Sequence, residues 1–177
     1  MDTVLVGTDV LLSGHKFVPG EDPMMFMKYN PNTMKMSRLS NMKEYRAGVS
    51  LATYKENIYA MGGLNFNFNG RLSSVEMYNI NRDQWYNIRP MNMPRSLAGA
   101  ATLNGNIYVV GGYNSSNNTT NSVEVFSPVE GEWRYINPMK VARADLKVVA
   151  MDGKLYAVGG FNGSSGRLKA VSTINKI

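Results

Sequence analysis

The chain has 177 residues, a net charge of +6 at neutral pH and no cysteine. This length suits a single domain with a buried core, and the lack of cysteine excludes disulfide scaffolds, thiolate metal sites and cysteine nucleophiles. The basic residues are scattered, so we expect no nucleic-acid partner. No apolar run approaches the roughly 18 residues of a membrane span, and no basic signal segment opens the chain, which together predict a cytoplasmic protein.

A short apolar run that ends in two glycines occurs three times, at 57–63, 106–112 and 154–160. The glycine pairs are 49 and 48 residues apart, and other residues recur in the same phase. These recurring residues are an arginine that opens each unit (Arg46, Arg95 and Arg143), a glutamate (Glu76 and Glu124) and, nine positions after it, a tryptophan (Trp85 and Trp133). A shared period near fifty residues predicts a repeat protein.

This set of markers resembles the kelch repeat, which forms one four-stranded blade of a β-propeller. The resemblance covers almost the whole chain. It implies an all-β fold in which each blade packs between two neighbours, and in which the tryptophans pack between blades. We therefore expect Glu76, Glu124 and the glycine pairs to have structural roles.

In chain order, residues 1–45 are interpreted as a degenerate repeat. With an offset of 49, Tyr29 takes the place of Tyr78, Met27 that of Glu76 and Met36 that of Trp85. The same offset places Val10–Gly14 over Tyr59–Gly63, and leaves only Val4–Val6 to form the innermost strand. Terminal repeats are often atypical, which fits this interpretation.

Residues 46–94 and 95–142 form the two full repeats. In the second of them, the small residues of 97–102 predict the innermost strand, and the apolar run 107–110 predicts a strand buried on both faces. The pairs Asn104-Gly105 and Asp152-Gly153 predict tight hairpin turns. Lys55-Glu56 occupies the equivalent place in the first full repeat.

Residues 143–177 begin a further repeat without completing it. The segment 168–174 aligns with the glutamate strand, but Ser172 replaces the glutamate, and no fourth strand follows. The expected fold is therefore an incomplete kelch β-propeller of about three and a half four-stranded blades, fewer than the four or more that usually close a propeller. Such an arc leaves apolar blade faces open, which predicts self-association, partner binding or aggregation.

The resemblance implies a binding face built from the loops that follow the glycine pairs and the loops that lead into the innermost strands. Arg and Tyr are preferred binding residues and Asn makes adaptable hydrogen bonds. The residues predicted to contact a partner are Arg46, Asn65, Arg95, Ser96, Tyr113, Asn114, Arg143, Phe161 and Asn162. The same arginines are also repeat markers, so a structural role is the competing interpretation. Phe66 and Phe68 lie in a polar loop, where core packing does not explain them.

The favoured function is a non-catalytic protein-interaction module, similar to kelch substrate receptors, that binds a protein partner such as an acidic peptide motif. Kelch proteins also bind actin, or join cullin ubiquitin ligases through a BTB domain. No BTB-like segment is visible here, so we do not expect this chain alone to recruit a cullin. Its shortened layout is similar to that of poxvirus kelch proteins.

The alternatives are a kelch-class enzyme, such as a sialate mutarotase or a specifier protein, and a non-functional fragment of a BTB-kelch ligase adaptor. An enzyme needs a cluster of acids, bases or metal ligands. The single histidine, His15, lies in the most degenerate repeat, and a copper site of the galactose-oxidase type needs a cysteine and several histidines. We therefore expect no catalysis, no metal and no cofactor.

Overall fold

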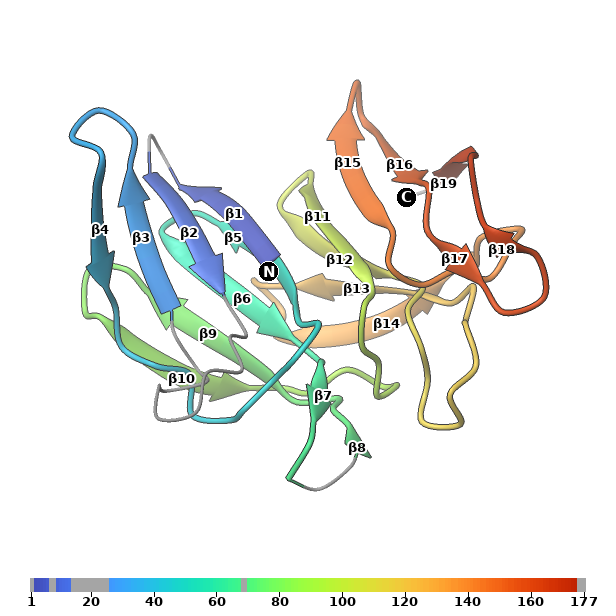
Figure 1. Ribbon diagram of the computed structural model, residues 1–177, viewed down its shortest axis with the longest axis horizontal. Coiled ribbons are helices and arrows are strands. Elements are labelled where there is room, and N and C mark those ends of the chain that lie inside the picture. The colour runs from blue at the N-terminus through green and yellow to red at the C-terminus, as the bar shows by residue number, and fades with distance from the viewer. Residues whose placement is uncertain (1, 7–8, 14–25, 68–69, 175–177) are drawn as a thin grey trace.

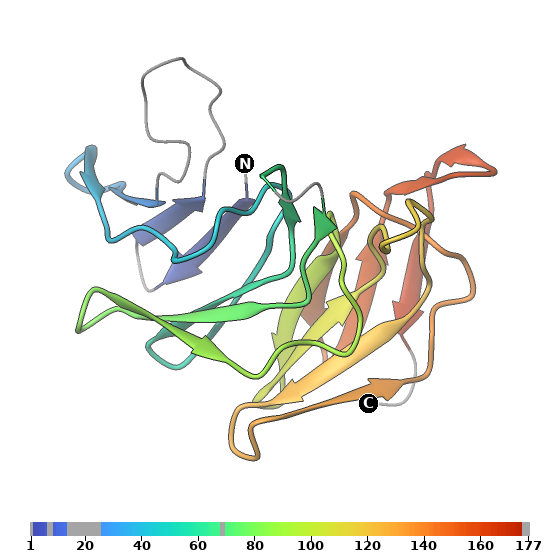
Figure 2. The same cartoon turned by 90° about the horizontal axis from the view of Figure 1, so that it is seen from below.

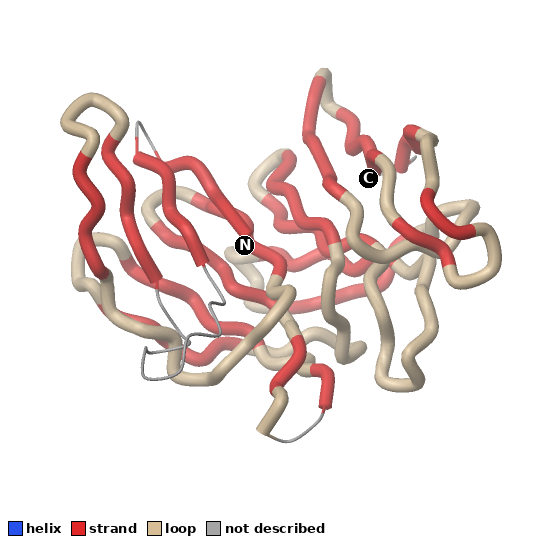
Figure 3. The backbone as a smooth tube through the Cα atoms, viewed as in Figure 1, coloured by secondary structure: helices blue, strands red, loops and turns tan. Residues whose placement is uncertain are grey.

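The computed structural model describes residues 2–6, 9–13, 26–67 and 70–174. Every regular element within these ranges is a β-strand, and no helix occurs among them (Figure 3). The all-β class expected from the sequence is confirmed. Since the described ranges hold no helix, they also hold none long and apolar enough to cross a membrane.

The first sheet has four antiparallel strands in the order β1-β2-β3-β4. Its strands are β1 (Asp2–Val6), β2 (Asp9–Ser13), β3 (Phe26–Asn30) and β4 (Lys35–Arg38). The innermost strand expected at Val4–Val6 is present as part of β1.

The pairing of β2 corrects the expected alignment of this sheet by one residue. Ser13 pairs with Phe26 in the way that Met61 pairs with Val75, so Ser13 takes the place of Met61 and not of Gly62. Leu11 then replaces Tyr59, and both are buried. Side chains alternate between the two faces of a strand. The expected alignment, which is off by one residue, therefore predicted Leu11 on the opposite face of the sheet. Gly14, on which the expected alignment relied, lies outside the described residues.

The second and third sheets each have four strands in meander order. The strands of the second are β5 (Ser50–Tyr54), β6 (Asn57–Met61), β9 (Val75–Asn79) and β10 (Gln84–Ile88). Those of the third are β11 (Gly99–Leu103), β12 (Asn106–Val110), β13 (Val123–Ser127) and β14 (Glu132–Ile136). The innermost strand of the third sheet thus starts two residues later than predicted.

The fourth sheet has three strands, β15 (Lys147–Met151), β16 (Lys154–Val158) and β19 (Val171–Ile174). The strand predicted over 168–174 is therefore shorter at its start. Two small hairpins stand outside the four sheets. They pair β7 (Leu64–Asn65) with β8 (Gly70–Arg71), and β17 (Phe161–Asn162) with β18 (Gly166–Arg167).

The four sheets follow one another along an arc, from the blue first sheet to the red fourth sheet (Figure 1). Turned by 90°, the first and last sheets lie at opposite ends of the molecule (Figure 2). The buried apolar residues form three clusters, and each cluster lies between two successive sheets. The sheets are thus the blades of an incomplete propeller. Their innermost strands line a central cavity of about 580 Å³, to which all four blades contribute.

The tight turns also agree with the sequence. Asn104 and Gly105 have φ angles of 50° and 77°, and Asp152 and Gly153 have 50° and 68°. Two successive positive values characterise the type I′ turn, whose twist matches that of the flanking strands. Trp85 and Trp133 are both buried between blades, as the repeat predicted, and their indole N–H groups donate to the carbonyl oxygens of Ser40 and Arg89 in the preceding blade.

Candidate protein-interaction face

Each of the first two glycine pairs ends a strand at a point where the next blade comes very close. Gly111 and Gly112 have φ angles of 64° and 99°, a region that favours glycine. A Cβ atom on Gly111 would lie 2.4 Å from the carbonyl oxygen of Arg143, and the N–H of Gly112 donates to that same oxygen at 2.8 Å. The preceding glycine pair approaches Arg95 in the same way. The glycines therefore join blades.

Arg95 lies inside the third blade, where it forms an ion pair with Glu124. Its Nη2 donates to Oε1 of Glu124 at 2.7 Å, and its Nη1 donates to the carbonyl oxygen of Gly111 at 2.9 Å. The Glu124 carboxylate also accepts the backbone N–H groups of Asn92 at 2.7 Å and Met93 at 3.1 Å. Both ion-pair residues are at most 1% exposed. The pair thus ties the connection from the second blade to the interior of the third.

Burial and the ion pair shift the pKa of Arg95 in opposite directions. Burial lowers the pKa of its guanidinium, and the charge of Glu124 raises it again. A buried charge is stable only when it is paired and hydrogen-bonded. The carboxylate is therefore part of what allows Arg95 to stay charged inside the blade.

The second blade repeats this arrangement with Arg46 and Glu76. The Nε and Nη2 atoms of Arg46 donate to Oε1 of Glu76 at 3.2 and 3.0 Å. Glu76 also accepts the backbone N–H groups of Lys43 at 2.6 Å and Glu44 at 3.0 Å. The structural roles expected for both glutamates are therefore confirmed.

The fourth blade has the arginine without the glutamate. Arg143 is 1% exposed, and its Nη1 donates to the carbonyl oxygens of Gly159 at 3.1 Å and Ala170 at 3.2 Å. Its Nη2 donates to the hydroxyl of Ser172 at 2.9 Å. Among the described residues no carboxylate forms an ion pair with it. Burial lowers its pKa, with no opposing charge.

The buried position of these arginines revises the contact set predicted from the sequence. Arg46, Arg95 and Arg143 are at most 5% exposed, and their guanidinium groups bond to their own blades. A partner could reach them only if the blade opened. The three arginines are therefore not among the partner-contacting residues of the binding face that we propose below.

Asn65 and Ser96 also lie beneath the surface, with exposed fractions of 2% and 3%. The side-chain oxygen of Asn65 accepts the backbone N–H of Asn67 at 3.0 Å, which shapes the loop after β7. The hydroxyl of Ser96 accepts a hydrogen bond from Nε of Arg71 at 2.9 Å. These two residues support the loops and present little surface to a partner.

The remaining four predicted contact residues are accessible. Tyr113, Asn114 and Asn162 are half-buried, and Phe161 is exposed. The side-chain oxygen of Asn114 accepts the N–H groups of Ser116 and Asn118, and that of Asn162 accepts those of Ser164 and Ser165. Each asparagine thus holds its own loop in shape, a common role for this residue in turns. Phe66 is half exposed and packs near the ring of Tyr45. Phe68 lies outside the described residues.

Arg71, which the sequence analysis did not single out, connects the second blade to the loops of the third. It donates from Nε to Ser96 and from Nη1 to the side-chain oxygen of Asn117 at 2.5 Å. Its guanidinium lies 5.4 Å from the ring centroid of Tyr113, a cation–π contact. Burial lowers the pKa of this guanidinium, while its interaction with Tyr113 raises it.

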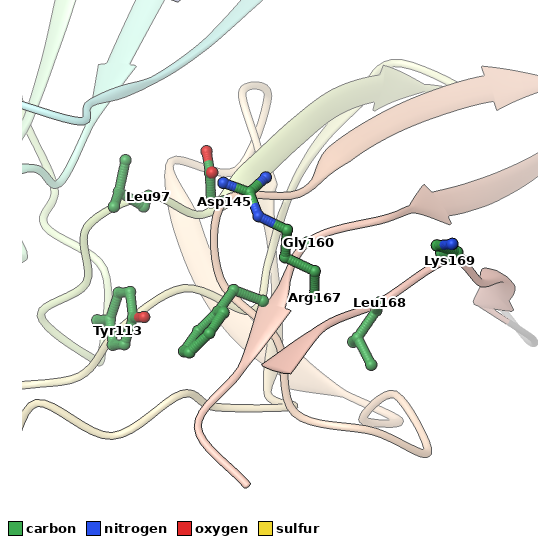
Figure 4. Close-up of a pocket in the computed structure, with 8 residues that line it drawn as sticks. Leu97, Tyr113, Asp145, Gly160, Arg167, Leu168 and Lys169 are labelled. Carbon is green, nitrogen blue, oxygen red and sulfur yellow. The ribbon is translucent and has the colours of Figure 1, made fainter. Parts of the chain in front are cut away.

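Arg167 occupies the same place in the fourth blade. Gly70-Arg71 and Gly166-Arg167 are the second strands of equivalent hairpins and are 96 residues apart, which is two periods. Arg167 is exposed, and its guanidinium points towards Asp145 (Figure 4). The repeated Gly-Arg dipeptide was the sequence signal that could have identified both residues.

An open pocket of about 500 Å³ lies on the loop face between the third and fourth blades (Figure 4). We call it the loop-face pocket. Its lining consists of Leu97, Tyr113, Asp145, Gly160, Phe161, Arg167, Leu168 and Lys169. Apolar and aromatic side chains therefore form its walls, with two cations and one carboxylate among them.

Leu97 has an unusual backbone conformation for a leucine. Its φ angle is 52°, and the equivalent residues Gly48 and Asp145 have 59° and 54°. Leucine in this left-handed region costs on the order of 1–2 kcal/mol. The side chain is nevertheless 40% exposed and lines the loop-face pocket. This strain at an exposed apolar residue marks the pocket as a candidate binding site.

The described residues contain no group of three or more His, Cys, Asp and Glu side chains that could hold a metal ion. His15 lies outside the described residues, so its surroundings are not described.

Comparison with known proteins identifies the repeats. The family model described as "Kelch motif" matches residues 45–92, 94–140 and 142–174. Kelch-like ECH-associated protein 1A of Danio rerio is 36% identical over 90 residues, which cover 50% of this chain and 15% of that protein. The human influenza virus NS1A-binding protein is 38% identical over 76 residues, 43% of this chain and 12% of that protein.

A third relative is beta-scruin of Limulus polyphemus, which is 32% identical over 93 residues, 52% of this chain and 10% of that protein. The matched segments thus span only a small part of the curated relatives. The similarity therefore concerns the repeats. It does not show that this chain shares the activities of the whole relatives.

Proposed function

Because the chain belongs to the kelch-repeat family, we propose that it is a non-catalytic protein-interaction module that binds a partner protein through the loop face. The observation that carries this proposal is the loop-face pocket, whose lining combines exposed Phe161 and strained Leu97 with two cations, Arg167 and Lys169. Aromatic and arginine side chains at the centre of a pocket are the usual sources of binding energy between proteins.

The proposed contact set keeps four residues predicted from the sequence and adds two. Tyr113 and Phe161 provide packing surface, and Asn114 and Asn162 hold the loops that frame the pocket. Arg167 and Lys169 supply positive charge to its lining. Arg46, Arg95 and Arg143 contribute indirectly, because they fix the blades from which these loops extend.

The two cations favour a partner segment that combines a carboxylate with an apolar side chain. A charge-assisted hydrogen bond from Arg167 or from Lys169 would hold the carboxylate. Leu97, Leu168 and Phe161 would surround the apolar group. Asp145 disfavours a second carboxylate close to β15 and so limits the orientation of the segment. A cytoplasmic location, as the sequence predicts, is part of this proposal.

Affinity capture with the purified protein tests the proposal. Wild type is compared with Phe161→Ala and Arg167→Ala, which alter exposed side chains of the pocket. We expect both variants to lose the proteins that wild type captures, and each truncation to weaken binding by about 2 kcal/mol, as is usual for central contact residues.

Val129→Asp is the matched control, since Val129 is 85% exposed in the turn between β13 and β14 and lies outside the pocket. It should capture the same proteins as wild type. Equal capture by wild type and both pocket variants would contradict binding through the loop face. A co-sedimentation assay with filamentous actin identifies whether the captured partner is actin or a protein of another class.

A further inference from the structure

The fourth blade exposes a face that is built for contact with another blade. In the third blade, Val110 pairs with Val123, and both are fully buried against the fourth blade. In the fourth blade, Val158 pairs with Val171 at the equivalent places, and the two are 40% and 63% exposed. We call the surface of a blade that points towards the next blade its forward face.

The rest of this forward face is also apolar. Tyr156 takes the place of buried Tyr108, and its strand partner Val149 is 50% exposed. Met151, which is 55% exposed, extends the surface along β15. Several exposed apolar residues on one sheet face mark an interaction surface.

The first blade exposes the complementary kind of surface, which we call its rear face. Val10 pairs with Tyr29 as Ile58 pairs with Tyr78 in the second blade, where both residues contact the first blade. Tyr29 in turn pairs with Met36, which is 53% exposed. Leu5, beside Val10 on β1, is 67% exposed.

Met36 stands at the place of the buried tryptophans. Trp85 pairs with Tyr78, and Trp133 with Phe126, and both indoles are covered by the preceding blade. The rear face of the first blade therefore has an aromatic and a thioether side chain where its counterparts have two aromatic rings. Methionine adapts readily to an irregular surface.

One difference between the rear faces concerns the buried glutamate. Glu76 and Glu124, on the rear faces of the second and third blades, accept N–H groups from the connection that arrives from the preceding blade. In the first blade Met27 pairs with Leu12 as Glu76 pairs with Ala60, so an apolar residue replaces the carboxylate. A buried carboxylate without such donors would be unfavourable. The rear face of the first blade is therefore more apolar than those of the second and third blades, and a surface that covers it need not supply such donors.

We propose that the forward face of the fourth blade packs on the rear face of the first blade of a second copy of this chain. The contact continues the interface that the chain already forms three times between its own blades. Because the two faces differ, one contact leaves one face of each kind free. If a two-fold axis relates the two copies, the free forward face and the free rear face form the same contact. The ring then closes with two copies.

The closed ring contains the four sheets of each copy, which makes eight blades. Propellers of about four to eight blades are common, so this number is within the normal range. Closure covers both apolar faces at once, whereas an open chain of copies always leaves two. The proposed assembly is a closed dimer.

Sedimentation velocity of the purified protein at micromolar concentration tests this. We expect a particle of twice the 19.6 kDa chain mass. Val171→Asp introduces a charge on the forward face, and Met36→Asp does so on the rear face. Each variant alone should sediment as a monomer, because a buried unpaired charge opposes both contacts of the ring. Val129→Asp, which changes a turn outside both faces, should remain dimeric.

Mixing the two variants distinguishes this arrangement from a symmetric contact between identical faces. Met36→Asp retains a native forward face, and Val171→Asp retains a native rear face. An equal mixture should therefore regain dimers through one native contact. Monomeric wild type, dimers that survive Met36→Asp, polymers of increasing size or a mixture that stays monomeric would each overturn the proposal.

Cross-linking provides a second measurement that does not depend on a disruptive charge. The chain has no cysteine, so Val171→Cys and Met36→Cys each carry a single thiol. A short bis-maleimide should join the two variants into a dimer when they are mixed, and should join neither alone in comparable yield. Equal yields from the mixture and from either variant alone would overturn the head-to-tail contact.

Discussion

The third and fourth blades have nearly the same sequence pattern but different surroundings. Val110 and Val123 are fully buried in the third blade, while Val158 and Val171 in the fourth are 40% and 63% exposed. The residue types are the same and the strand pairing is the same. A repeat therefore specifies the blade, whereas the presence of the next blade decides whether its forward face is buried.

The interiors of the two blades differ in a second way. Arg95 has Glu124 as its partner, whereas Arg143 has the hydroxyl of Ser172. In the third blade the carboxylate also accepts two backbone N–H groups from the incoming connection. The third blade is thus held to its neighbour by an ion pair that the fourth blade lacks.

Removing the largest interblade side chain should destabilise the protein most. Trp133 packs 4.9 Å from the ring centroid of Phe126 and donates to the carbonyl oxygen of Arg89. Trp133→Ala should lower the free energy of unfolding by about 3–5 kcal/mol, which a urea titration measures. A loss below about 1 kcal/mol would show that the interface between the second and third blades contributes little, against the range usual for such truncations.

Breaking the ion pair of the third blade should have the next largest effect. Glu124→Gln keeps the shape of the side chain but leaves the charge of Arg95 buried and unpaired. We expect a loss of about 3 kcal/mol in the free energy of unfolding. Ser172→Ala in the fourth blade removes one neutral hydrogen bond and should cost about 1 kcal/mol. Equal losses from the two changes would contradict the distinction between the blades.

Restoring the ion pair in the fourth blade should have the smallest effect. Ser172→Glu places a carboxylate beside Arg143, but Ser172 is only half-buried, so solvent screens the pair. We expect a gain of about 1 kcal/mol in the free energy of unfolding, with Ser172→Gln as the uncharged control. The gain should diminish in high salt, whereas no difference between the two variants would show that the carboxylate is not needed there.

Much of the fold could be predicted from the sequence because its signals are local and repeated. The glycine pairs, the Asn-Gly and Asp-Gly turns and the apolar strands recur in one phase, so each repeat supports the interpretation of the others. The predicted register of β2 is wrong by one residue, because the prediction aligns Gly14 with Gly63. A single degenerate marker cannot fix a register when the side-chain period is two.

The binding face was harder to predict, because a recurring arginine fits either a binding or a structural role. The spacing of Arg95 and its glutamate indicates the structural role. Glu124 follows Arg95 by 29 residues, and Glu76 follows Arg46 by 30. A charge that recurs with an opposite charge is usually paired inside a repeat. The repeat period places Leu97 over Gly48, which was the sequence signal for an unusual backbone there, but the exposure of the leucine side chain in the pocket emerges only from the structure.

The melting temperature of Arg95→Ala, compared with those of Trp133→Ala and the surface control Val129→Asp, tests the central claim most directly. We claim that Arg95 stabilises the third blade and does not contact a partner. Its removal leaves Glu124 buried without its counter-charge, which should cost about 3 kcal/mol or more. The account predicts a melting temperature close to that of Trp133→Ala. A value equal to that of Val129→Asp, together with lost partner capture, would contradict it.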